Sequence, residues 1–277
     1  MSKVCHLSGE GPVLVSTDLH GCWEDFVALE RRFEALCQRD PRARWVLLGD
    51  LVHGPSPEIA ARQPRLYGYE DASAAIVARV AERVAREPER VLFVLGNHDH
   101  AHLDGRPTRK FYDDERAHLE SGMSPEAVAQ LRGLFEGALL AVSTSCGALL
   151  THGSPGAELT SLEDLGAIDL RPGASRTQAQ RDMLETVLWS YGQLPEITDQ
   201  MLAQINHALP PAEAQHVVIH GHDRDEDGWF VEGHNQLCPV IFGAHRADRR
   251  CVILDLSARY ASVSDLCTPD VLVRVHG

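Results

Sequence analysis

Short apolar runs recur along the chain, and five of them end in a cluster of polar residues. These runs cover residues 13–15, 45–48, 91–95, 148–150 and 217–219. Apolar residues that are continuous rather than alternating are typical of strands covered on both faces, as in layered α/β folds. Ligands of such folds gather beyond the carboxyl ends of the strands. We therefore expect one functional site where these five strands end.

Patterns of helical period lie between the strands. They cover residues 23–38, 73–86, 125–135 and 177–191. The end of the chain differs, because short strand patterns separated by turn residues follow one another there, at 228–231, 240–242, 251–256 and 271–275. This order predicts an α/β fold with a mostly antiparallel ending and a second sheet facing the first. No internal repeat or low-complexity linker interrupts the pattern, so we expect a single domain over residues 1–277.

The overall charge narrows the range of partners. Lys plus Arg number 26 and Asp plus Glu number 40, which gives a net charge of −14. Such a field repels polyanions and argues against nucleic acid or an anionic membrane as a partner. A phosphate group bound by this chain would need a local positive site.

Nothing in the sequence predicts export or a membrane span. No uninterrupted apolar run approaches 18 residues, and residues 1–15 lack the charged-then-apolar order of a signal peptide. The seven cysteines are scattered without a Cys-x-x-Cys pair, so we expect reduced thiols. The cytoplasm is therefore the expected location.

The polar clusters at the strand ends contain residues that bind metal ions. Asp18 and His20 are two residues apart, so they project from the same face at the end of a strand and can hold one ion. Asp50 follows Asp18 by 32 residues, which accommodates one crossover helix between neighbouring parallel strands. A carboxylate between two ions can bind both, one with each oxygen. We expect this bridging role for Asp50.

A second ion could be held by Asp50 together with Asn97, His152 and His222. This mixture of nitrogen and oxygen ligands suits manganese, iron or zinc rather than calcium. Two such ions about 3.5 to 4 Å apart clamp a phosphoryl group and lower the pKa of a bridging water to near neutrality. The predicted nucleophile is thus a metal-bridging hydroxide. His98, next to Asn97, is expected to protonate the leaving alkoxide as a general acid.

Each cluster by itself is a common turn or surface sequence, whereas five in order, each directly after an apolar run, form a specific set. They resemble the five signatures of calcineurin-like metallophosphoesterases, namely Asp18-Leu19-His20-Gly21, Gly49-Asp50-Leu51-Val52, Gly96-Asn97-His98-Asp99, His152-Gly153 and Gly221-His222. The resemblance spans about residues 13–256. It implies a four-layer αββα sandwich and two divalent transition-metal ions, with manganese the first expectation.

Further segments resemble the phosphoprotein phosphatase branch. Residues 111–115, Phe-Tyr-Asp-Asp-Glu, are similar to the segment after the Asn-His motif of that branch, and residues 222–229 match its histidine, acidic stretch, glycine and aromatic residue. In this register the resemblance implies that His222 takes the ligand role, and that His220 either supports a ligand without binding the ion or is structural. The position two residues after His222 is Arg224, so the resemblance implies only three protein ligands plus water for the first ion.

The chain departs from that branch in the loop after Asp50. The family continues with Asp-Arg-Gly, whereas this chain has His53 and Gly54, so the arginine that grips phosphate and the aspartate that orients the general acid are both missing there. A second family arginine has no clear counterpart among Arg171, Arg176 and Arg181. Replacement cations could come from Arg106, Arg109, Lys110 or Arg246.

These features predict a dinuclear-metal phosphomonoester hydrolase of the serine/threonine protein phosphatase type, acting on a phosphoprotein or a small phosphoester. Two alternatives stay open. The motifs around Asp50 and Asn97 also resemble symmetrical diadenosine tetraphosphate hydrolases. A metal-binding scaffold without catalysis is the other alternative, because the phosphate-gripping arginine is missing.

Overall fold

The computed structural model describes residues 2–277, and its strands form two mixed sheets. The six-stranded sheet has the order β1 (Val4–Leu7), β5 (Ala141–Thr144), β6 (Ala148–Thr151), β7 (Val217–Ile219), β9 (Gln236–Pro239) and β8 (Trp229–Glu232). The five-stranded sheet has the order β11 (Leu272–Arg274), β10 (Arg250–Asp255), β2 (Pro12–Ser16), β3 (Arg44–Leu47) and β4 (Val91–Phe93). β2, β3 and β4 run parallel, as do β6, β7 and β9, so their carboxyl ends lie at common edges.

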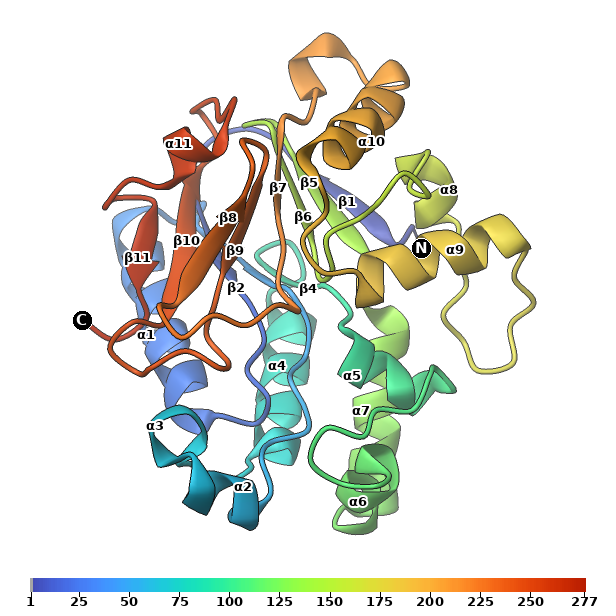
Figure 1. Cartoon of the computed structure of the whole chain (residues 1–277), viewed down its shortest axis with the longest axis vertical. Coiled ribbons are helices and arrows are strands. Elements are labelled where there is room, and N and C mark those ends of the chain that lie inside the picture. The colour runs from blue at the N-terminus through green and yellow to red at the C-terminus, as the bar shows by residue number, and fades with distance from the viewer. Residues whose placement is uncertain (1) are drawn as a thin grey trace.

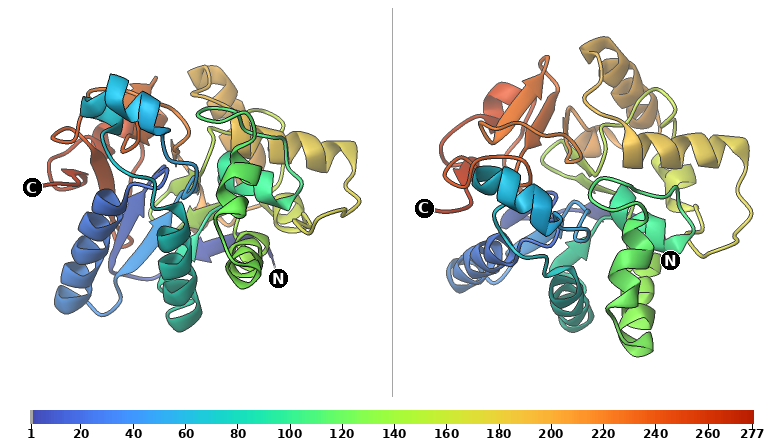
Figure 2. Two further views of the ribbon diagram at one scale, coloured as in Figure 1. Left: turned by 90° about the horizontal axis from the view of Figure 1, so that it is seen from below. Right: turned by 60° about the horizontal axis from the view of Figure 1, so that its bottom comes forward.

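Helices cover the outer faces of both sheets (Figure 1). Three of them lie in a row along one side of the molecule (Figure 2): α1 (Trp23–Arg39), α4 (Ser73–Arg86) and α7 (Pro125–Gly137). On the side of the six-stranded sheet lie α8 (Leu162–Gly166), α9 (Gln178–Trp189) and α10 (Pro195–His207). The connections carry short helices: α2 (Pro57–Arg62), α3 (Pro64–Tyr67), α5 (Asn97–His100), α6 (Glu115–Ser121) and α11 (Val263–Leu266), with 3₁₀ turns η1 (Ala101–Leu103) and η2 (Pro211–Glu213). The predicted four-layer sandwich is confirmed.

The apolar strands are buried on both faces, as their continuous patterns predict. Val13 and Val15 of β2 belong to a core cluster that contains residues of both sheets, whereas Leu14 between them packs in the cluster that includes the helices. Trp45 of β3 is fully buried and lies 5.8 Å and 5.7 Å, between ring centroids, from Phe26 and Phe33 of α1. Alternate side chains of one strand therefore fill two different layers.

The chain's last third departs from one strand prediction. Residues 240–242 are not a strand; the strand β9 lies just before them, at Gln236–Pro239. Gln236 breaks the apolar pattern, yet it is buried and its side-chain amide donates to the carbonyl of Gln193. Residues 240–242 instead lead to the functional site, where the centroid of the Phe242 ring lies 4.0 Å from that of His20. The short strands β1 and β5 and the helix α10 were not predicted.

The structure of residues 2–277 also bears on the state of the cysteines and on membrane-spanning helices. All seven cysteines are free thiols in the structure, in agreement with the sequence analysis. Within this part of the chain, no helix combines the length and the apolar character that crossing a bilayer requires.

Candidate metal centre

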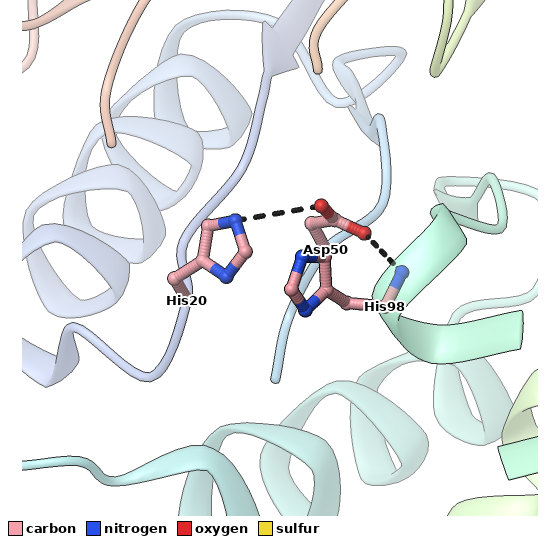
Figure 3. A group of neighbouring side chains, drawn as sticks. All are labelled: His20, Asp50 and His98. Carbon is pink, nitrogen blue, oxygen red and sulfur yellow. Dashed lines mark hydrogen bonds and ion pairs between the residues drawn. The ribbon is translucent and has the colours of Figure 1, made fainter. Parts of the chain in front are cut away.

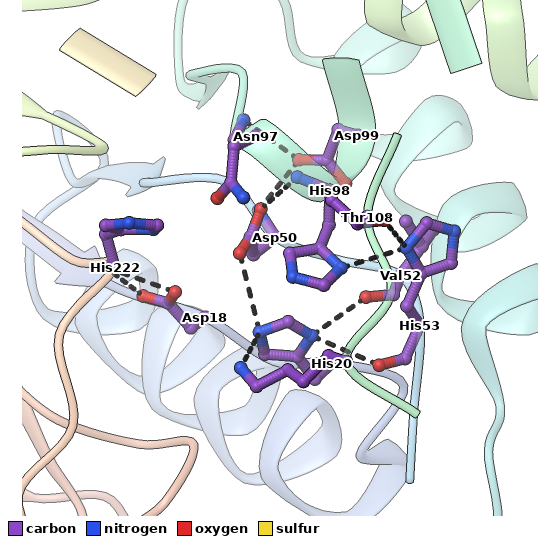
Figure 4. A network of polar contacts seen from close by, with 12 residues as sticks. Asp18, His20, Asp50, Val52, His53, Asn97, His98, Asp99, Thr108 and His222 are labelled. Atoms are coloured by element: carbon purple, nitrogen blue, oxygen red, sulfur yellow. Dashed lines mark hydrogen bonds and ion pairs between the residues drawn. The ribbon is translucent and has the colours of Figure 1, made fainter. Parts of the chain in front are cut away.

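The loops that follow β2, β3, β4 and β7 converge at one place (Figure 4), and His152 after β6 contacts Asn97 and Asp50 there. This convergence follows from the sheet order, because parallel strands present their carboxyl ends at the same edge. The structure brings together all six residues that the sequence analysis proposed as metal ligands. They are Asp18 and His20 after β2, Asp50 after β3, Asn97 after β4, His152 after β6 and His222 after β7.

Asp50 lies between two groups of potential ligands. Its Oδ2 is 3.4 Å from His20 Nε2, and its Oδ1 is 3.6 Å from His152 Nε2. Figure 3 shows the His20 side of this arrangement. His222 completes the second group, whose ligand atoms lie within 4.8 Å of one another. The two oxygens of one carboxylate thus face two separate sets of nitrogen donors, as a bridging ligand must.

Backbone carbonyls fix which ring nitrogen of two histidines is available. His20 Nδ1 lies 3.0 Å from the Val52 carbonyl oxygen, and His152 Nδ1 lies 2.7 Å from that of Leu48. A ring nitrogen that faces a carbonyl must donate, so a neutral ring carries its lone pair on Nε2. In both rings this Nε2 points to the centre of the cluster.

Several acceptors at the centre face one another without a donor between them. Asn97 Oδ1 lies 2.9 Å from His152 Nε2, which carries a lone pair in the tautomer just assigned. His222 Nε2 is buried and has no hydrogen-bond partner among residues 2–277. Acceptors at such distances repel each other unless a cation lies between them. The donor set therefore fits divalent transition-metal ions, which take mixed nitrogen and oxygen ligands.

Burial favours the neutral form of the titratable groups in the cluster. Burial raises the pKa of Asp18, and burial together with the Asp18 charge raises that of Asp50 well above the ordinary value. Burial lowers the pKa of His20 and brings that of His222 to about 2. Neutral histidines are the form that binds a metal, and a divalent cation would offset the cost of the ionised carboxylates.

Strained backbone and two glycines allow the ligands to approach each other. His20, Asp50 and His222 have φ values of 42°, 51° and 69°, in the left-handed region that non-glycine residues rarely adopt. A Cβ atom at Gly96 would overlap Asp50 Oδ1, and one at Gly221 would overlap Asp18 Oδ2. The glycines of these motifs are thus explained by close packing against the ligands.

Asp99 is a residue whose function the sequence analysis missed. Its carboxylate accepts three backbone hydrogen bonds, from Asp50 N at 2.7 Å, Gly96 N at 3.0 Å and Leu51 N at 3.0 Å. Burial and the Asp50 charge raise the pKa of Asp99 to about 7. Asp99 thereby ties the loop after β3 to the loop after β4. The only sequence signal was its place in the Gly-Asn-His-Asp motif.

His98 lies against the metal cluster without occupying a predicted ligand position. Its backbone N–H donates to Asp50 Oδ1 at 2.9 Å, and its ring stands edge-on to that of His20 at 4.6 Å between centroids. His98 Nδ1 faces away from this cluster, toward His53 and Glu115. A ring nitrogen of His98 also lies within 4.8 Å of ligand atoms of His20 and Asp50, so His98 is close enough to act on a group bound there. The general-acid role itself stays a prediction.

Among the proposed replacement cations, Lys110 reaches the cluster. Its Nζ lies 3.5 Å from His20 Nε2 and 4.1 Å from the centroid of the Phe242 ring. Burial and the charge of Arg224 lower the pKa of Lys110 to about 8. A cationic side chain therefore lies directly beside the predicted ligand His20.

The other predicted cations have different surroundings. The Arg106 guanidinium lies 4.7 Å over the Trp189 ring and 3.6 Å from Glu185, and Arg246 pairs with Glu24 at the surface. Arg109 forms no ion pair with any of residues 2–277. His220 is fully buried, and its Nδ1 lies 2.9 Å from the Gly221 carbonyl oxygen, which agrees with a structural role.

Comparisons with known proteins agree with this geometry. A protein serine/threonine phosphatase from Saccharomyces cerevisiae, similar to human phosphatase PP5, matches with a TM-score of 0.59 and 16% identity, over 86% of this chain and 71% of its own. The cold-active protein-tyrosine phosphatase of a psychrophilic Shewanella species gives 0.57 and 12% identity, over 92% and 77%. At these identities the likeness shows the fold. The family model described as calcineurin-like phosphoesterase matches residues 11–246, whereas no curated protein matches the chain.

Proposed function

The chain belongs to the calcineurin-like phosphoesterase family and is a phosphoester hydrolase, and we propose that it removes phosphate from phosphomonoesters with the help of two divalent transition-metal ions. Phosphoserine and phosphothreonine in proteins are the proposed substrates, with small phosphoesters as further ones. Manganese is the proposed metal, and iron or zinc would suit the same ligands. The expected cytoplasmic location stays a prediction.

The observation that carries the proposal is the position of Asp50. One carboxylate oxygen faces His20 and the other faces His152, at 3.4 Å and 3.6 Å. A site for a single ion would need no carboxylate open on two sides. In this proposal Asp18 and His20 hold the first ion, Asn97, His152 and His222 hold the second, and Asp50 holds both.

Ions bound there would polarise the phosphoryl group and make water acidic enough to act as a nucleophile near neutral pH. The chain's own side chains supply the remaining chemistry. Lys110 places a positive charge beside the metal ligands, where it can bind a phosphate oxygen. His98 donates its Nε2 proton to the leaving oxygen, so that an alcohol rather than an alkoxide departs.

Two features favour a phosphomonoester over a dinucleoside polyphosphate. Lys110 Nζ lies 3.5 Å from the predicted ligand His20 and Arg224 is close enough for its charge to act on Lys110, whereas a chain of four phosphates would need more cations than these two. The net charge of −14 also disfavours a polyanion. The serine/threonine phosphatase from yeast supports the choice of protein substrates only through its fold.

A substrate panel with the manganese-loaded protein tests the proposal. We expect inorganic phosphate to be released from phosphoserine and phosphothreonine peptides with a higher kcat/KM than for diadenosine tetraphosphate. A phosphotyrosine peptide and p-nitrophenyl phosphate complete the panel. Asp50→Asn is the matched control, because it keeps the size of the side chain and removes the charge that serves both ions.

Three outcomes would contradict the proposal. Preferential conversion of the dinucleotide to two molecules of ADP would favour the tetraphosphate hydrolase. Binding of two ions without turnover of any substrate would favour the non-catalytic scaffold. Equal turnover by the Asp50→Asn variant would show that the observed activity does not come from this site.

A further inference from the structure

A row of buried imidazoles leads from the proposed general acid to the surface of the protein. His98 Nδ1 lies 2.9 Å from His53 Nδ1, and His53 Nε2 lies 3.0 Å from His102 Nε2. His102 Nδ1 lies 2.8 Å from Glu120 Oε1. Arg132 donates to the other oxygen of Glu120 at 2.8 Å. We call His98, His53, His102 and Glu120 the imidazole chain; Figure 4 shows its first bond.

The hydrogen bonds of the imidazole chain can have only one direction. Glu120 accepts a bond from Arg132 and is ionised, so His102 Nδ1 must be the donor toward it. His102 and His53 are both buried, which favours the neutral form of each ring, so each carries one proton. His102 Nε2 is then an acceptor, and His53 must donate from Nε2.

The same reasoning fixes the proton on His98. His53 has its single proton on Nε2, so its Nδ1 is an acceptor and the bond from His98 must come from Nδ1–H. The Thr108 hydroxyl, 3.3 Å from His53 Nδ1, is placed to donate to the same atom. His98 therefore keeps a proton on Nδ1, and its Nε2 is the ring nitrogen left for the metal cluster and the substrate.

Glu115 places a carboxyl group beside this first bond. Its Oε1 accepts from the Phe111 N–H at 2.9 Å, whereas its buried Oε2 has no hydrogen-bond partner among residues 2–277. Oε2 lies 3.3 Å from His98 Nδ1 and 3.7 Å from His53 Nδ1. Glu115 Oε2 and His53 Nδ1 therefore approach the same nitrogen of His98 from two sides, and an N–H at His98 Nδ1 can be held by both.

We propose that the imidazole chain and Glu115 are positioning residues for His98. The chain holds the Nδ1 proton of His98 and fixes the orientation of the ring, and Glu115 Oε2, 3.3 Å from the same nitrogen, holds the ring from a second side. When the Nε2–H bond breaks and the leaving oxygen gains that proton, His98 becomes a neutral ring that retains Nδ1–H. Four residues, His53, His102, Glu115 and Glu120, thereby replace the aspartate that is missing from the loop after Asp50.

This inference rests on the proposed function for its catalytic meaning, but the protonation pattern can be measured without any turnover. ¹⁵N NMR of the zinc-loaded protein, which is diamagnetic, reports the protonated nitrogen of each ring. We expect a proton on Nδ1 of His98, on Nε2 of His53 and on Nδ1 of His102. A proton on His53 Nδ1 would overturn the proposal. So would a third bound zinc together with unprotonated Nδ1 atoms in His98 and His53, which would make that cluster a metal site.

Kinetics with two leaving groups then test the positioning role. His53→Phe removes the acceptor of His98 Nδ1–H, and we expect kcat for phenyl phosphate, a poor leaving group, to fall by about 10-fold to 100-fold. The loss should be much smaller for p-nitrophenyl phosphate, whose leaving group hardly needs a proton. His53→Asp should recover most of the activity, because its carboxylate can accept the same bond and aspartate tolerates the left-handed backbone at φ 69°.

His100→Phe is the matched control for loss of a buried histidine. His100 is buried, but its Nε2 has no partner among residues 2–277 and it is not part of the imidazole chain. We expect this variant to leave the ratio of the two substrates unchanged. Equal losses on both substrates for His53→Phe, or no recovery in His53→Asp, would overturn the positioning role. If the wild-type protein hydrolyses neither substrate, the proposed function fails, and the NMR result still decides the protonation pattern.

Discussion

Removing the carboxylate of Asp99 should destabilise the protein even though Asp99 is not a predicted ligand. Its two oxygens accept the backbone N–H groups of Asp50, Leu51 and Gly96, at 2.7 to 3.0 Å. All three donors lie in buried loops that carry the metal site. Asp99→Ala would leave the three donors buried without an acceptor.

The structure sets the size of the effect. Each buried donor that loses its acceptor costs about 1–3 kcal/mol, which gives about 3–9 kcal/mol for three. Burial raises the pKa of Asp99 to about 7, which means that burying the ionised carboxylate destabilises the wild-type protein. Removing the carboxylate also removes this destabilisation, so the net loss is smaller than the sum for three donors. We therefore expect a loss of about 3–6 kcal/mol in the free energy of unfolding for Asp99→Ala. Asp99→Asn, whose single carbonyl oxygen can still accept two of the bonds, should lose about 1–3 kcal/mol.

Urea unfolding in the presence of a chelator, followed by tryptophan fluorescence, measures these losses without a contribution from metal binding. The buried Trp45 is a suitable reporter. The matched control is Asp114→Ala, because Asp114 accepts only one bond, from Ala117 N at 2.9 Å at an exposed helix start. That variant should lose about 1 kcal/mol. If Asp99→Ala lost no more than Asp114→Ala, the three-bond role of Asp99 would be wrong.

Four further predictions address the metals, the acid, the cation and the pH dependence. Asp50→Asn should lower the metal content, measured by elemental analysis, from about two ions per chain to one or fewer, since a bridging ligand serves both; unchanged content would refute the bridge. His98→Ala should keep its metal and lose about 100-fold to 10,000-fold in kcat on alkyl phosphates, with a smaller loss on p-nitrophenyl phosphate. Lys110→Met should raise KM for phosphomonoesters by about 10-fold to 100-fold, the value of one charge-assisted hydrogen bond; an unchanged KM would exclude Lys110 from phosphate binding. Burial acts to raise the pKa of Asp25, but the bonds to His276 and Arg249 outweigh burial, and the pKa lies below the ordinary value. The ionised Asp25 therefore stabilises the fold above about pH 4, and this stabilisation is lost as the pH falls through the folded-state pKa. The urea midpoint of Asp25→Asn should decline less steeply below pH 4 than that of the wild type.

The sequence was sufficient for the layered α/β class and for the set of candidate ligands. Both follow from local patterns, because a strand buried on two faces must be apolar throughout and because parallel strands end at a common edge. Val13 to Val15 are such a strand, and Asp18 and His20 come directly after it. Motif glycines such as Gly96 and Gly221 carried the same information, since only glycine fits against the ligand carboxylates.

The sequence could not settle contacts between segments that are far apart in the chain. Four cations were equal candidates for phosphate binding, and the path of the loop before α6 is what brings Lys110 rather than Arg246 to His20. The strand prediction at 240–242 was wrong for a related reason. Gln236 can lie in a buried strand because distant polar groups satisfy its side chain, and no local pattern contains that information.

The sequence by itself therefore determined the layered α/β class, the ends of five strands and the residue types of the candidate metal centre, because each depends on periodicity and on chain direction. The tertiary structure alone decided how those residues act on one another. Leu48 and Val52 fix the lone pairs of two predicted ligands through backbone carbonyls, and Glu115 approaches His98 from a separate helix. Proton positions and charge compensation depend on distances of a few ångströms between residues that are tens of positions apart, and only the packed fold sets those distances.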